Sequence, residues 1–168
     1  MVLLQTKSPY LGKGRLADVL AALQVMGAGQ RPEGEIRKWA KELSYSETSV
    51  EIARWEAVFK EHPEFFLVYK LDGSDTLKAA LRWRYTNKLY DSKSGKEYTQ
   101  IEKDQLPEKE RWLLTTKPLT SDAIAALMST AIELHNRAIA EQKERRWLVP
   151  PLVAFLGALL GAVLGGHK

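Results

Sequence analysis

The sequence predicts a mainly helical α+β protein, in which three helices and a β-hairpin are followed by a long amphipathic helix and one C-terminal transmembrane helix. Two patterns predict this fold. Apolar residues recur at helical spacing before residue 62 and alternate with polar residues after residue 65. The 168-residue chain holds 25 basic and 21 acidic residues, yet residues 147–166 have no ionisable side chain. The expected parts are an N-terminal arm 1–14, a soluble domain 15–119 with a polar loop 86–110, a connecting helix 120–146 and a transmembrane helix 147–166.

Three short helical segments open the domain. The first spans residues 16–26 and ends at two glycines, the second spans 33–43, and Pro63 ends the third. Thr48 and Glu51 have the capping-box spacing at the start of the third segment. Each segment is too short to be stable alone, so we expect their apolar faces to share one core.

The sequence period changes to two after these helices. Residues 65–71 and 77–85 are expected to form the strands of a hairpin, joined by the turn DGSD at 72–75. The second strand is expected to have an apolar face with Leu77, Ala79, Leu81, Trp83 and Tyr85, and a cationic face with Lys78, Ala80, Arg82 and Arg84.

Three helices followed by a hairpin is the order of elements in a helix-turn-helix core with a wing. Residues 15–85 therefore resemble a winged-helix domain. The resemblance rests on element order and covers under half of the chain. It implies a module that binds DNA or docks a protein.

Residues 86–110 are polar and rich in turn residues, with SKSG at 92–95 as the expected tip of a second hairpin. Residues 111–115 are expected to return as a short strand. Thr120 or Ser121 then caps a helix that runs to about Arg146. The apolar stripe by which this helix should pack on the domain consists of Ile124, Leu127, Met128, Ala131, Leu134, His135 and Ala138.

The uncharged stretch 147–166 predicts a membrane span. Ten of its twenty residues are Leu, Val or Phe, which favours insertion by about 3 to 6 kcal/mol. A helix of this length rises about 30 Å, the thickness of the hydrocarbon core. The alternative is a buried core helix, but a small domain has little core to cover it. The juxtamembrane basic residues, which place the domain in the cytoplasm and the helix in the inner (cell) membrane, are Lys143, Arg145 and Arg146.

Small residues recur every fourth position in this stretch and should lie on one helical face. In lipid, such a face permits close helix packing, so it favours self-association, although a simple anchor also tolerates small residues. The face consists of Ala154, Gly157, Ala158, Gly161, Ala162 and Gly165. Pro150 and Pro151 are expected to stop or kink the helix, and thus to form a hinge near Val149.

Enzymatic motifs are absent from the sequence. The chain has no cysteine and no phosphate-binding glycine loop, and its histidines are not at metal-ligand spacing. His62, at the end of the third helix, is interpreted as a capping residue, and His135 as a packed residue. We therefore expect no catalytic residues, no metal and no cofactor.

Basic residues are the candidate contacts for a partner or for nucleic acid. Because phosphate contacts require cations, the candidates are Arg31, Arg37, Lys38, Lys41, Arg82 and Arg84. Against sequence-specific DNA recognition, the third helix is net acidic. A protein partner, a solvated surface and attraction to anionic lipid remain alternatives.

The predicted layout of domain, hinge and glycine-lined helix resembles the small membrane effectors of bacterial antiphage systems, including retron-type systems. The resemblance is architectural. It implies a non-enzymatic toxin that a protein or nucleoprotein partner restrains, such as a reverse transcriptase with its nucleic acid. The helix would then self-associate and perturb the lipid bilayer. The alternatives are a tail-anchored DNA-binding regulator and a membrane scaffold for a protein partner.

Overall fold

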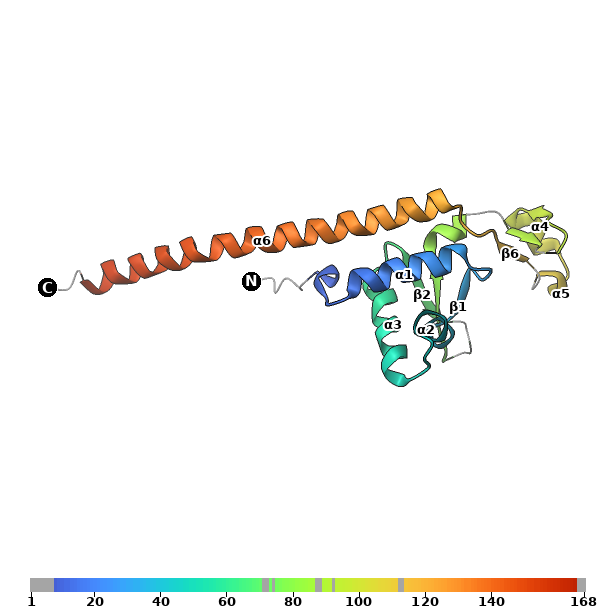
Figure 1. Ribbon diagram of the computed structural model, residues 1–168, viewed down its shortest axis with the longest axis horizontal. Coiled ribbons are helices and arrows are strands. Elements are labelled where there is room, and N and C mark those ends of the chain that lie inside the picture. Colours follow the sequence, from blue (N-terminus) through green and yellow to red (C-terminus); the bar gives the residue numbers. More distant parts are fainter. Residues whose placement is uncertain are drawn as a thin grey trace.

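The computed structural model describes residues 8–70, 73, 75–86, 89–91, 93–111 and 114–165, and of these it leaves out the side chains of 85, 86, 100 and 145–165 (Figure 1). The elements in chain order are η1 (Pro9–Leu11), α1 (Arg15–Ala28), β1 (Glu33–Glu35), α2 (Ile36–Ser44), α3 (Ser49–Glu61), β2 (Phe66–Lys70), β3 (Leu77–Leu81), η2 (Arg82–Thr86), β4 (Leu89–Asp91), β5 (Glu97–Tyr98), α4 (Gln100–Gln105), α5 (Glu108–Arg111), β6 (Leu114–Thr116) and α6 (Ser121–Gly165).

The predicted helices and hairpin are present and surround one core. Helix α1 ends at Gly29, as expected, and the Thr48 hydroxyl accepts a hydrogen bond from the Glu51 amide at the start of α3. The indole of Trp39 donates to the carbonyl of Ala79 at 2.9 Å and so joins α2 to the sheet. The core consists chiefly of Val19, Ala22, Leu23, Met26, Trp39, Ala40, Trp55, Val58, Phe59, Phe66, Ala79 and Leu81.

The first sheet has three antiparallel strands in the order β1-β3-β2. Its β2–β3 hairpin pairs Phe66 with Leu81. The sequence did not predict β1, which pairs Glu33 with Ala80, because its three residues, EGE, were included in the second helix. Gly34 lies in this strand under the Trp39 ring, where an added Cβ would be 3.3 Å from two ring atoms.

The predicted strand 77–85 is too long. Strand β3 ends at Leu81, and the next five residues form the 3-10 helix η2. The alternation that placed Arg82 and Arg84 on one cationic face therefore stops before it reaches them. The turn at η2 directs Arg84 into the protein interior, where carbonyl oxygens bind its guanidinium.

The expected polar loop 86–110 instead contains two strands and two short helices. Strands β5, β4 and β6 form a second antiparallel sheet, in which Tyr90 pairs with both Glu97 and Thr115. The predicted hairpin turn is present over the described residues 93–95: Asp91 accepts hydrogen bonds from the Lys93 amide and the Ser94 hydroxyl. Helix α4 begins with a capping box, in which Thr99 and Glu102 each accept a hydrogen bond from the backbone of the other.

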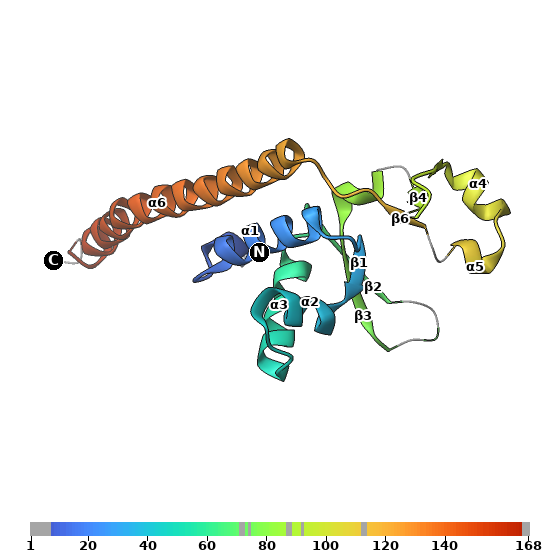
Figure 2. The same cartoon turned by 45° about the vertical axis from the view of Figure 1, so that its right-hand side comes forward.

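Helix α6 is one element of 45 residues. Its first part packs along α1 and η1, and its remaining length extends past the domain in both views (Figures 1 and 2). Three residues of the predicted stripe, Leu127, Ala131 and Ala138, are buried. Helix α6 continues through Pro150 and Pro151, so the predicted stop of the helix there is wrong, and the predicted kink stays a prediction. Each proline removes only one amide donor, and the surrounding helical turns keep the backbone in register.

The predicted fold class also needs correction, because it included a separate transmembrane helix. In the part of the chain that the structure describes, no helix is both long and apolar enough to cross a membrane. The molecule is a mixed α+β protein with six α-helices and two small sheets in its described residues. Residues 147–165 prolong the helix that begins at Ser121, so the predicted boundary between a connecting helix and a separate helix is absent. The predicted small-residue face lies outside the described side chains.

Candidate partner-binding surface

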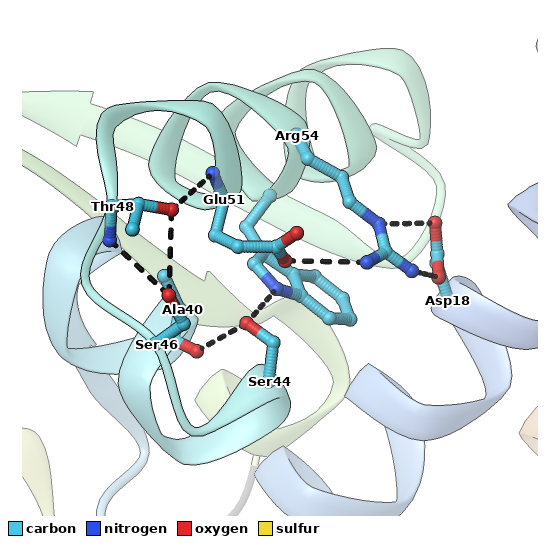
Figure 3. Close-up of polar contacts among 8 residues, drawn as sticks. Asp18, Ala40, Ser44, Ser46, Thr48, Glu51 and Arg54 are labelled. Atoms are coloured by element: carbon cyan, nitrogen blue, oxygen red, sulfur yellow. Dashed lines mark hydrogen bonds and ion pairs between the residues drawn. The ribbon is translucent and has the colours of Figure 1, made fainter.

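The corner between α2 and α3 is held by a network of side-chain hydrogen bonds (Figure 3). The Ser44 hydroxyl donates to the Ala40 carbonyl at 2.7 Å and accepts from the Trp55 indole at 3.2 Å. The Ser46 hydroxyl donates to that of Thr48 at 3.3 Å. These bonds fix the backbone that connects the two helices, so the corner presents its side chains in a defined arrangement.

Arg54 ties the same corner to α1. Its guanidinium makes two bonds to the carboxylate of Asp18 and one, at 3.2 Å, to Glu51 (Figure 3). The bond to Asp18 is the largest cause of a raised pKa of Arg54. Because Asp18 is buried and paired in this way, Arg54 joins α3 to α1.

Tyr45 projects from this corner into solvent. It caps α2 in the left-handed region, with φ 54°, and 96% of its surface is exposed. A residue with a Cβ is disfavoured there by about 1–2 kcal/mol, and glycine is the usual occupant. Val50, at the start of α3, is 73% exposed. The corner therefore displays an aromatic and an aliphatic side chain on a rigid support, which is typical of a binding surface.

The basic residues around the corner are paired with carboxylates. Glu47 binds Lys41 at 2.7 Å and Arg37 at 3.8 Å, and the hydrogen bond from Lys41 lowers the pKa of Glu47. Lys38 binds Glu35 at 2.8 Å and likewise lowers the pKa of that carboxyl group. The predicted contact Arg31 lies 3.6 Å from Glu42. The surface thus carries charges of both signs and no continuous cationic patch.

Arg84 is fully buried, so its predicted role as a surface contact is wrong. Its guanidinium donates to the carbonyls of Met26 and Gly29, at 2.9 and 2.6 Å, and to that of Thr116 at 2.6 Å. Burial lowers the pKa of this group. Arg84 donates hydrogen bonds to carbonyls at the end of α1, where the helix itself offers no donors, and connects them to β6 of the second sheet.

The other predicted site residues lie apart from the corner. Arg82 is exposed and donates to the Pro63 carbonyl at 3.0 Å, on the far end of α3. Lys143 is exposed on α6. The side chains of Arg145, Arg146, Pro150 and Pro151 lie outside the described residues. Among the predicted contacts whose side chains are described, the structure therefore brings together only the four basic residues of the α2 region.

The α3 helix ends at a second polar cluster. His62 is the C-cap, as expected, but it is also fully buried. The Tyr10 ring contacts it edge-on at 4.4 Å, and Glu64 lies 3.2 Å from its Nδ1. The main cause of the lowered pKa of His62 is burial, which disfavours the charged form. No group of three His, Asp or Glu residues within the described portion could hold a metal ion.

Sequence reasoning missed Tyr45 and Tyr10. A usable signal for Tyr45 was present, because a tyrosine that directly follows the last residue of an amphipathic helix occupies the position of the usual glycine cap. No comparable signal existed for Tyr10. Comparisons of the chain with protein families, with curated proteins and with solved structures found no match.

Proposed function

We propose that the chain is a non-enzymatic effector: its domain is held by a protein or nucleoprotein partner, and α6 is an arm that self-associates and perturbs a membrane through its uncharged end. This proposal rests on the observation that α6 has two parts, one that packs on the domain and one that extends beyond it. One helix packs on the domain up to Ala138 and then leaves it. The part beyond the domain includes residues 147–166, which have no ionisable side chain. Water solvates such a surface poorly, so it favours contact with lipid or with other copies.

The α2–α3 corner supports a protein component in the partner. Aromatic side chains on rigid supports dominate the energy of many protein interfaces. The mixed charges of Arg37, Lys41 and Glu47 suit a protein surface with charges of both signs. The carboxylates of the corner weaken the attraction of these cations for a bare polyanion.

Expression toxicity tests the arm. We expect induction of the full chain to depolarise cells, and a chain that ends at Arg146 to be harmless. The shorter chain keeps every α6 residue that is buried against the domain, since the last of these is Ala138. Replacement of Gly157, Gly161 and Gly165 by Leu should abolish toxicity if close helix packing is required. Equal tolerance of the full and shortened chains would contradict the effector proposal.

A DNA-binding regulator is the second candidate, because the order α1-β1-α2-α3-β2-β3 resembles that of winged-helix domains. Its expected property is DNA binding by residues 1–146 that weakens with salt and with Arg37→Ala or Lys41→Ala. Against it, the cations Arg54 and Lys60 of α3 are paired with acidic residues. Salt-independent binding, or none, would exclude this candidate.

A further inference from the structure

Tyr10 connects three elements that are distant in sequence. Its hydroxyl donates to Oε1 of Glu64, beyond the end of α3, and its ring packs against His62. Its carbonyl oxygen lies 2.9 Å from Nδ1 of His135 on α6. Only 6% of the Tyr10 surface is exposed. The short helix η1 is therefore fixed to the domain by the Tyr10 side chain and to α6 by the Tyr10 backbone.

Helix α6 is anchored to the domain near two points. At the first, α1 and α6 approach so closely that a Cβ on Gly27 would lie 2.9 Å from Ile124. At the second, His135 bonds to η1. His135 comes eleven residues after Ile124 along the helix, a rise of about 16 Å. Beyond Ala138, α6 leaves the domain, so the η1 contact lies where the docked part of the helix ends.

The two anchors differ in chemistry. The Gly27 anchor is close apolar packing, which does not depend on a single polar group. At the η1 anchor, the His135 bond adds to the apolar packing of Ala131 and Ala138. Its surroundings are incompletely paired: within the described residues, the buried His62 Nε2 and Arg15 Nε have no hydrogen-bond partner. Buried polar groups without partners destabilise the arrangement that buries them. The η1 end is therefore the weaker anchor.

We propose that η1 is a latch that holds the second half of the docked part of α6. With Tyr10 seated on His62 and Glu64, residues 129–138 lie against the domain. When Tyr10 leaves, this segment separates from η1 while the Gly27 anchor keeps the start of α6 in place. The part of α6 that is free of the domain then begins closer to Ile124, because it also includes residues 129–138. That this release activates the arm rests on the proposed function; the latch itself does not.

Hydrogen exchange in the full-length chain tests the latch. Tyr10→Ala should raise exchange of residues 129–138 at least about tenfold more than exchange of residues 122–128 and of α3. Tyr69→Ala is the matched control, because it removes the ring of a tyrosine that makes a similar bond to a carboxylate, that of Glu33, away from α6. It should leave α6 unchanged.

His135→Leu provides a second test from the α6 side, since it removes the bond to η1 without changing the η1–α3 contacts. This substitution should accelerate hydrogen exchange of residues 129–138. Unchanged exchange in both variants would overturn the latch, as would equal acceleration throughout the domain. If the effector proposal is also correct, Tyr10→Ala should be more toxic than the wild type. Faster exchange without greater toxicity would support the latch and contradict the effector proposal.

Discussion

The two ends of α3 use tyrosine in opposite ways. At the N-terminal end, Tyr45 projects into solvent from a corner whose polar groups are hydrogen-bonded to one another. At the C-terminal end, Tyr10 is buried against His62, where two nitrogen atoms of the described cluster lack partners. The N-terminal end of α3 therefore presents a side chain to solvent, whereas the C-terminal end holds separate chain segments together. Removal of each tyrosine should therefore have very different effects on folding.

The largest effect is expected for Tyr10→Ala. Removal of a buried aromatic ring leaves a cavity and costs about 3 kcal/mol of the free energy of unfolding. It also leaves Glu64 without the phenol that it accepts from. Urea unfolding of the full chain measures the change. A loss no greater than that of Tyr45→Ala would remove the distinction between the two ends.

Loss of the α3 cap is expected to have a smaller effect. Thr48→Ala leaves the Glu51 amide without its acceptor and should lower the free energy of unfolding by about 1 kcal/mol. Thr48→Ser keeps the acceptor oxygen and is the matched control. Equal destabilisation by both substitutions would mean that the hydroxyl is not what stabilises this corner.

The pH dependence of stability should come from the C-terminal end. The pKa of His62 in the folded state is lowered from its ordinary value of 6.5 by burial. The unfolded chain therefore binds this proton first as the pH falls, so stability should be constant above about 6.5 and should decrease below it. Unfolding measured from pH 7.5 to 5 should show this decrease in the wild type. His62→Gln should reduce the slope, and an unchanged slope would contradict the assignment to His62.

The smallest effect is expected for Tyr45→Gly, and it has the opposite sign. Glycine adopts the left-handed conformation of this position without a steric penalty, so the variant should be more stable by about 0.5–1 kcal/mol. If the corner binds the partner, the same variant should bind it less tightly. Destabilisation by this substitution would mean that the Tyr45 ring packs on the domain.

Local patterns predicted the parts of the fold in which neighbours along the chain determine the structure. The three helices, the β2–β3 hairpin and the start of α6 follow from periodicity, caps and turn residues. The buried stripe of α6 was also predictable, because an amphipathic helix must cover its apolar face. The predicted separate transmembrane helix was wrong, since a change in composition at residue 147 does not mark the end of a helix.

The remaining errors come from contacts between distant residues. Alternation predicted Arg84 on a strand, but the carbonyls that attract it lie 55 and 58 residues earlier, at Gly29 and Met26. Tyr10 lies in an arm without periodicity, and its partners are 54 and 125 residues away. The acidic residues that pair with the α2 cations were visible in the sequence, but their pairing depends on the geometry of the corner.

The central claim is that the part of α6 beyond the domain acts on lipid while the domain serves a partner. Liposome flotation of the purified full chain and of the chain that ends at Arg146 tests it most directly. We expect the full chain to float with the vesicles and the shorter chain, with its domain intact, to stay in the dense fraction. Recovery of both chains in the dense fraction, or equal flotation of both, would contradict it.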